Sequence, residues 1–166
     1  MSISKGGQSV KPYVGSKEVK EAYVGTQKVY SAAPPIYYGF LGSANDYVKA
    51  DWVVLSPSYA AIVKDQGIYR IALTSPGVGT IKLNSILGTF IKFSFRSNGA
   101  HGGEVGVIQF FKGTSKIKQE YIGTNDENNY FLKSYEIPAG TDNIMIYPQT
   151  YLRVTGYVDQ LRYENE

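Results

Sequence analysis

Residues 89–96 read TFIKFSFR, and this stretch decides the fold class of the larger part of the chain. Ile91, Phe93 and Phe95 fall on one face of an extended segment, and the residues between them are polar. A period of two is the pattern of an antiparallel strand with one buried face. The stretch therefore predicts a strand that lines one side of a hydrophobic core.

Other short runs continue this pattern, with turn residues between them. Residues 67–74 alternate in the same way, and residues 104–111 are apolar on both faces, as in a central strand. Only residues 58–65 suggest a helix, of about two turns. Many short strands at this spacing predict an all-β fold, an antiparallel β-sandwich or jelly roll. The remaining predicted strands are 116–122, 130–137, 143–147 and 152–163.

A repeat with a period of ten precedes these strands. Tyr-Val-Gly at 13–15 recurs at 23–25, and the unit Tyr-Val-Gly-x-x-x-Val-x-x-Ala occurs twice. Gly-Ser at 15–16 and Gly-Thr at 25–26 have the composition of two-residue type II′ hairpin turns. We therefore predict a small antiparallel β-meander, which is too small to bury its own apolar face and must attach to something larger. The attaching residues are expected to be Tyr13, Val14, Gly15, Val19, Tyr23, Val24, Gly25 and Val29.

A pair of prolines, Pro34 and Pro35, follows the repeat. Proline fixes φ, supplies no backbone donor and restricts the residue before it. The sequence therefore predicts two parts, an N-terminal anchoring segment at 1–33 and a β-sandwich domain at 34–166. The second part has the usual size of one domain.

Composition excludes several classes of function. The formal net charge is only +3, and Lys and Arg form no run of five, so neither nucleic acid nor an anionic membrane is indicated. With no cysteine, the chain has no disulfides and no thiolate sites, which fits synthesis in a reducing cytoplasm. We also expect no signal peptide and no membrane span.

Residues suited to catalysis are few. The single histidine, His101, lies in a glycine-rich loop, which positions a general base poorly. Of the carboxylate candidates Asp126, Glu127, Asp142 and Asp159, Asp126 and Glu127 lie in a polar turn and are expected to be solvated, with calcium or glycan contact as the alternative. We therefore predict that the chain is not an enzyme.

Asp159 is expected to have a partner. A strict period of two in residues 157–163 places it on the same face as Tyr157, Leu161 and Tyr163. A carboxylate on an apolar face requires a hydrogen-bond network or a metal ion. Asp159 is therefore either a structural aspartate with hydrogen-bond partners or a ligand of a structural calcium ion, and the sequence does not decide between them.

Aromatic side chains near loops form another candidate group. A flat ring can stack on the apolar face of a pyranose, and such rings on a sandwich surface can bind sugar. Core or edge packing is the alternative reading, especially for the only tryptophan. The candidates are Trp52, Tyr130, Tyr147 and Tyr151.

Two stretches near the C-terminus resemble jelly-roll carbohydrate-binding modules of the calcium-containing kind. Residues 135–141 read YEIPAGT, like the late strand and Pro-Ala-Gly turn of such modules, and residues 157–161 read YVDQL, like their final strand. Gln160 stands where that family has a second aspartate. The resemblance implies a glycan-binding jelly roll with a possible structural calcium at Asp159.

The N-terminal repeat resembles segments at the start of structural proteins of tailed bacteriophages. In those proteins a short β-segment attaches a surface domain to the virion. Together the resemblances imply a virion accessory protein of the tail, baseplate or capsid surface, assembled in the host cytoplasm and released by lysis. Its expected partners are other virion proteins, copies of itself and host-surface polysaccharide. A capsid decoration protein that binds no sugar and a free carbohydrate-binding module are the alternatives.

Overall fold

The structure is a computed structural model of the 166-residue chain. It describes residues 36–75, 78–99, 103–124, 126–149 and 152–165, and the backbone of short strands before residue 32. By contacts between residues, the chain divides into two compact units, Met1–Pro35 and Ile36–Glu166. The division lies two residues from the predicted boundary, and independent folding of the two parts stays a prediction.

The strands described in the N-terminal unit form three antiparallel pairs. The pairs are β1 (Ser4–Lys5) with β2 (Gln8–Ser9), β3 (Tyr13–Val14) with β4 (Lys17–Glu18), and β5 (Glu21–Val24) with β6 (Gln27–Ser31). The turns predicted at 15–16 and 25–26 lie outside the described residues. Among the described strands each pair is a separate two-stranded sheet, so the repeat forms successive hairpins and not one continuous meander.

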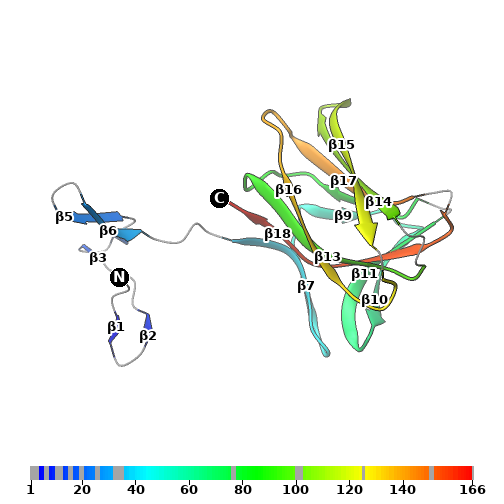
Figure 1. The fold of residues 1–166 in the computed structure, drawn as a ribbon, viewed down its shortest axis with the longest axis horizontal. Coiled ribbons are helices and arrows are strands. Elements are labelled where there is room, and N and C mark those ends of the chain that lie inside the picture. The colour runs from blue at the N-terminus through cyan, green and yellow to red at the C-terminus, as the bar shows by residue number, and fades with distance from the viewer. Residues whose placement is uncertain are drawn as a thin grey trace. The chain divides into compact units, whose positions relative to one another are not determined.

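The larger unit is a sandwich of two antiparallel sheets (Figure 1), which confirms the predicted fold class. The first sheet has seven strands, and β18 (Thr155–Glu164) lies at its centre. Its main order is β10-β11-β18-β13-β16, and β7 also pairs with β18 and with the edge strand β8. The other six strands are β7 (Tyr37–Gly42), β8 (Tyr47–Lys49), β10 (Ala60–Asp65), β11 (Ile68–Thr74), β13 (Phe90–Ser97) and β16 (Phe131–Glu136).

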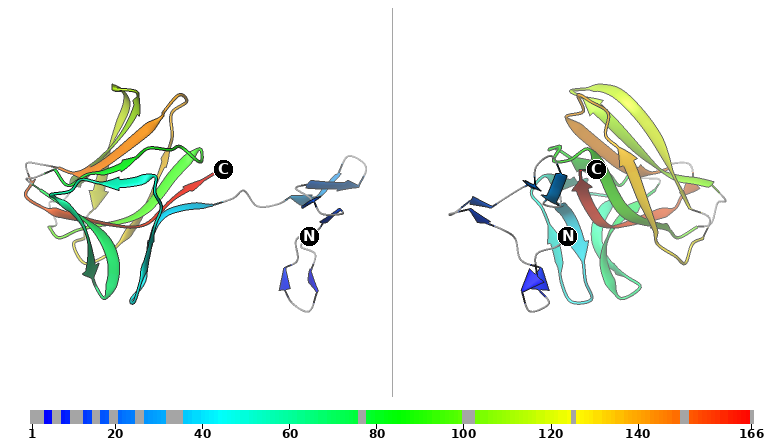
Figure 2. Two further views of the ribbon diagram at one scale, coloured as in Figure 1. Left: turned by 180° about the vertical axis from the view of Figure 1, so that it is seen from behind. Right: turned by 60° about the vertical axis from the view of Figure 1, so that its left-hand side comes forward.

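The second sheet has five strands in the order β15-β14-β17-β12-β9. Figure 2 shows this sheet facing the first one from two further directions. The predicted strand at 104–111 corresponds to β14, which pairs on both sides and is therefore an inner strand, as expected. The five strands are β9 (Val53–Leu55), β12 (Ile81–Leu83), β14 (Gly103–Lys112), β15 (Ser115–Thr124) and β17 (Asn143–Pro148).

The core lies between the sheets and is built from the alternating positions. Ile91, Phe93 and Phe95 are fully buried, which confirms the face predicted from TFIKFSFR. Residues of the five-stranded sheet, such as Ile108 and Phe110, belong to the same hydrophobic cluster. No helix in the described part of the chain has the length and hydropathy to cross a membrane.

The only helix candidate, residues 58–65, contains no helix, and its residues 60–65 form β10. All six residues of β10 pair with β11, from Ala60 opposite Leu73 to Asp65 opposite Ile68. Ile62 and Val63 are β-branched, which favours a strand, and Ala60 and Ile62 pack against the core on alternating positions. The apolar run was too short to separate helix from strand by its pattern alone.

Candidate functional site

The outer face of the five-stranded sheet carries a row of aromatic and apolar side chains. Val107 of β14 is paired with Tyr121 of β15 on one side and with Tyr147 of β17 on the other. Val107 is almost fully buried, whereas the Tyr121 side chain is 46% exposed and Tyr147 is half-buried. Burial raises the pKa of the Tyr147 phenol, and the neighbouring Tyr121 adds to this shift. The row therefore consists of two phenol rings, one on each side of the Val107 side chain.

A second row crosses all five strands beside the first. By register it contains Gln119, Gln109, Met145, Lys82 and Val54, one residue from each strand. Because alternate residues share a face, this row lies on the same side as Tyr121 and Tyr147. All five side chains are half-buried or exposed.

The two glutamines of this row are joined to each other. Gln109 Nε2 donates to Gln119 Oε1 at 2.7 Å, and Lys116 Nζ donates to the same oxygen at 3.0 Å. An amide has two N–H donors and one acceptor oxygen. Within the described residues, no hydrogen bond is recorded for the Gln119 Nε2 donors or the Gln109 Oε1 acceptor. These groups are available to hydroxyl groups of a ligand.

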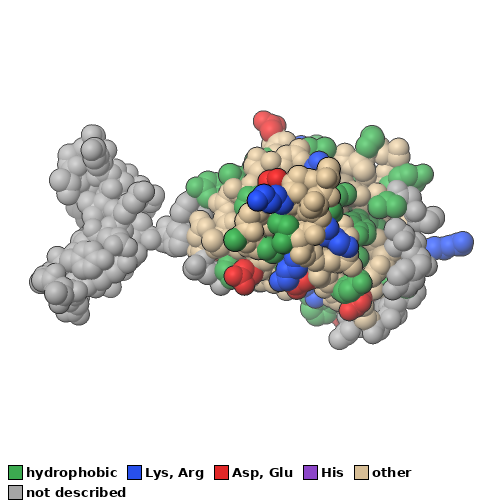
Figure 3. All heavy atoms as spheres, turned by 90° about the horizontal axis from the view of Figure 1, so that it is seen from above, with side chains coloured by type: hydrophobic (Ala, Val, Ile, Leu, Met, Phe, Trp, Pro, Cys, Tyr) green, Lys and Arg blue, Asp and Glu red, His purple; other side chains and the backbone are tan. Residues whose placement is uncertain are grey.

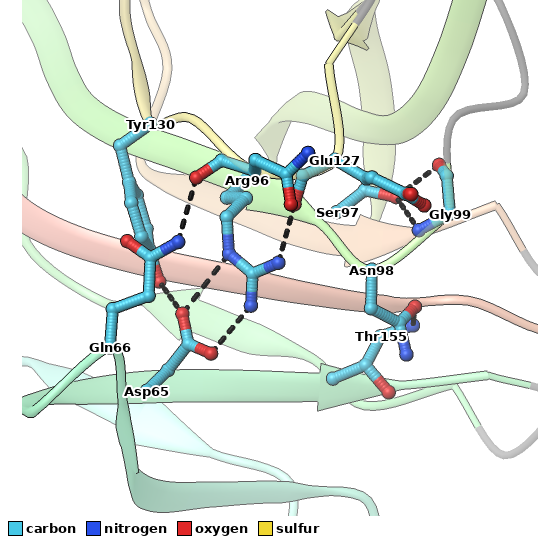
Figure 4. Close-up of polar contacts among 10 residues, drawn as sticks. Asp65, Gln66, Arg96, Ser97, Asn98, Gly99, Glu127, Tyr130 and Thr155 are labelled. Atoms are coloured by element: carbon cyan, nitrogen blue, oxygen red, sulfur yellow. Dashed lines mark hydrogen bonds and ion pairs between the residues drawn. The ribbon is translucent and has the colours of Figure 1, made fainter.

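The outer face of the seven-stranded sheet carries a charged cluster instead (Figure 4). The Asp65 carboxylate at the end of β10 accepts from Arg96 Nε at 3.1 Å and Nη2 at 2.5 Å, and from the Tyr130 hydroxyl at 2.6 Å. Arg96 Nη1 donates to the Glu127 carbonyl, and Gln66 Nε2 donates to the Asn128 carbonyl. These bonds hold the loop at 126–130 across the sheet. Burial, followed by the bond to Asp65, raises the pKa of Tyr130.

Arg70 connects this cluster to Asp159. Its guanidinium carbon lies 4.2 Å from the Tyr130 ring centroid, and its Nη1 forms an ion pair with Asp159 Oδ2. Gly42 N–H donates to the other carboxylate oxygen at 2.9 Å. The side chains of Arg70 and Asp159 are only 10% and 2% exposed. Asp159 is thus a buried carboxylate with both oxygens hydrogen-bonded.

Asp159 shares a face with Tyr157, as predicted, but Leu161 and Tyr163 face the core on the other side of the sheet, so that part of the prediction is wrong. Gln160 has a φ of +52°, and β18 carries one extra residue opposite β13, where Ser94 pairs with Asp159 but Lys92 pairs with Arg162. This β-bulge shifts the alternation by one residue. Leu161 therefore shares the core face with Val158, and Asp159 lies on the outer face.

The donor set around Asp159 does not fit a calcium ion. Calcium takes six to eight oxygen ligands, whereas the groups that contact this carboxylate are a guanidinium and a backbone N–H. Among the described residues, no three His, Cys, Asp or Glu side chains are grouped so that they could hold a metal ion.

The predicted sugar-binding aromatics lie in three different places. Trp52 is half-buried, packs against the core and lies 5.1 Å from the Tyr163 ring centroid. Tyr130 belongs to the charged cluster, and Tyr147 lies on the outer face of the five-stranded sheet. Tyr151 and His101 lie outside the described residues. Of the three candidates that the structure describes, Trp52, Tyr130 and Tyr147, no two lie together.

The predicted anchoring residues can be placed only by backbone. Tyr13 and Val14 form β3, and Tyr23 and Val24 end β5. Val29 lies in β6. Gly15, Val19 and Gly25 lie outside the described residues.

Sequence reasoning missed Tyr121, Gln109 and Gln119 as members of a surface. In β15 the charged residues Lys116, Lys118 and Glu120 alternate with Ile117 and Tyr121. Much of this strand is exposed on both faces, and Ile117, for example, is 42% exposed. These residues could have been identified only from the pairing of this strand with residues 104–111, which places Tyr121 opposite Val107. That register follows from the connection at 113–114 and its bulge, and the residue pattern alone does not supply it.

Among solved structures, the chain is similar to family 29 carbohydrate-binding modules. A family 29 module from Piromyces equi is 11% identical, with 78% of this chain and 87% of that chain covered and a TM-score of 0.50. A variant of CBM29-2 complexed with cellulohexaose is 10% identical, with 81% and 95% covered and a TM-score of 0.52. No protein-family model and no curated protein matches the chain. At this identity the likeness establishes the fold alone.

Proposed function

We propose that residues 36–166 form a non-catalytic carbohydrate-binding module, and that its glycan site is the outer face of the five-stranded sheet. The observation that carries the proposal is the pair of rows on this face. Tyr121 and Tyr147 offer flat apolar rings, and the adjoining glutamines offer unused amide groups. A sugar ring has an apolar face and a rim of hydroxyls, so it requires both kinds of contact at once.

The fold supports this proposal. The similar structures are carbohydrate-binding modules, and one of them is complexed with cellulohexaose. The second row runs across all five strands, which are spaced about 4.8 Å apart. A surface of that extent suits several consecutive sugars of a polysaccharide better than a single residue.

Replacing Tyr121 and Tyr147 together with Ala is expected to weaken polysaccharide binding by at least about 30-fold, since central aromatic contacts are typical hot spots worth about 2 kcal/mol or more. Binding would first be located on a glycan array and then measured by calorimetry. The matched control is Tyr59→Ala, because Tyr59 is 49% exposed and precedes β10 in the other sheet. Equal binding by the double variant, or no glycan bound by the native chain, would contradict the proposal.

The N-terminal segment at 1–33 is proposed to attach this module to a bacteriophage virion, where many copies would strengthen weak binding to a host-surface glycan. Separate two-stranded hairpins support an attachment role, because an isolated hairpin is at best marginally stable in water. A free module and a capsid decoration protein that binds no sugar remain the competing readings.

Deletion of residues 1–33 is expected to leave glycan binding unchanged and to abolish incorporation into particles. Particles assembled with full-length or truncated chain would be purified, probed for the protein and imaged. Normal incorporation of the truncated chain would exclude the attachment role. Loss of particle stability in its absence, with no glycan bound by the native chain, would favour the decoration protein.

A further inference from the structure

A depression of about 260 Å³ opens at the edge of the sandwich. It is lined by Gly123 and Thr124 at the end of β15 and by Phe131 and Lys133 at the start of β16. These two strands are the edge strands of their respective sheets, so the depression lies where the two layers meet. Its volume is slightly below that of pockets for drug-sized ligands, which suits a single small ring.

Lys133 supplies an unmatched positive charge to this depression. Its side chain is half-buried, and burial lowers the pKa of its ammonium group. Within the described residues, no ion pair or hydrogen bond is recorded for Lys133. The carboxylate of Glu120, on the same edge, pairs with Lys118 at 2.5 Å. A partly desolvated cation without a counter-ion gains more from an incoming anion than a fully hydrated one does.

Phe131 supplies a flat apolar wall beside that charge. Its side chain is 37% exposed, and Lys133 Nζ lies 5.6 Å from its ring centroid. A sugar ring stacked on Phe131 would therefore hold a substituent of the ring close to the ammonium group. On the face drawn in Figure 3, Lys and Arg side chains are interspersed with acidic and hydrophobic ones.

We infer that the depression between β15 and β16 is a subsite for a carboxylate-bearing sugar residue, a hexuronic acid. The pyranose ring stacks on Phe131, and the carboxylate pairs with Lys133. This inference deepens the proposed function, because it makes an acidic polysaccharide the preferred ligand class. A neutral sugar lacks the group that Lys133 would bind.

The test is an NMR titration of the full chain with D-glucuronate, D-glucose and acetate as separate probes. Glucuronate is expected to bind with millimolar affinity and to shift the signals of Phe131 and Lys133. Glucose, which lacks the charge, and acetate, which lacks the ring, are each expected to bind at least about tenfold more weakly, a difference of about 1.4 kcal/mol. Equal binding of acetate or of glucose, or no shift with glucuronate, would overturn the inference.

Three variants test where glucuronate binds. Lys133→Gln is expected to reduce glucuronate binding to the level of glucose, whereas Lys64→Gln, which removes an exposed charge on β10, should change nothing. An effect of the same size in Lys64→Gln would reduce the site to general electrostatics and overturn the inference. Tyr121→Ala with Tyr147→Ala separates this site from the proposed glycan face: glucuronate binding that persists in that variant supports an independent subsite, and its loss overturns it.

Discussion

Replacing Asp159 with Asn is expected to lower the free energy of unfolding by about 3–5 kcal/mol, because the change leaves the Arg70 guanidinium buried without its charge partner. Arg70 is only 10% exposed, and its Nε is already buried without a hydrogen-bond partner among the described residues. The measurement is equilibrium denaturation in urea, followed by circular dichroism. The matched control is Asp51→Asn, since Asp51 is exposed.

A second variant distinguishes the loss of the ion pair from the cost of leaving the Arg70 charge buried and unpaired. Replacing Arg70 with Met and Asp159 with Leu together removes both charges, and it should cost less than Asp159→Asn alone, because no unpaired ion remains. If Asp159→Asn lowered the free energy of unfolding by less than about 1 kcal/mol, the Arg70–Asp159 pair would not behave as a buried ion pair, because exposed ion pairs contribute no more than that.

Replacing Gly42 with Ala is expected to destabilise the sandwich by up to about 3 kcal/mol, through overpacking. A Cβ at this position would collide with the backbone carbonyl of Tyr69, which a rotamer change cannot relieve. The collision would also displace the Gly42 N–H from Asp159 Oδ1. The loss would be measured by denaturation in urea.

Gly103→Ala is the control for Gly42→Ala. Gly103 lies in β14, and a Cβ there would have no neighbour within 4 Å. The variant should therefore change stability by a few tenths of a kcal/mol at most, or increase it slightly by restricting the unfolded chain. Equal stability of Gly42→Ala and the native chain would show that β7 and β11 are not in close contact at this point.

The strands of the core were predictable because each carries its own signal. The alternation at 89–96 placed Ile91, Phe93 and Phe95 correctly, and the apolar run at 104–111 identified an inner strand. These are local properties of the residues, so they need no knowledge of the partner strand. The sandwich followed from the number and spacing of such segments.

The clusters were not predictable because their members come from distant parts of the chain. Asp65, Arg96 and Tyr130 belong to three elements and meet only after β10, β13 and the loop at 126–130 are in place. Tyr121 and Tyr147 face the same way because both strands pair with β14. The residue pattern gives the core face of a regular strand, but it does not give the strand's neighbours, its register or a bulge such as the one at Gln160.

Because of the bulge at Gln160, the positions of β18 that face the core differ before and after this residue. Before it, even-numbered positions such as Val158 face the core; after it, odd-numbered positions such as Leu161 do. Deleting residue 160 itself would restore strict alternation and leave Asp159 and Leu161 on opposite faces, as they are now. Deleting another residue of β18 would instead turn the residues on one side of the deletion to the other face of the sheet. The number of residues on each side of Gln160 is therefore under tighter constraint than the identity of the residue at 160, and deletions elsewhere in β18 should be tolerated far less than substitutions at its exposed positions.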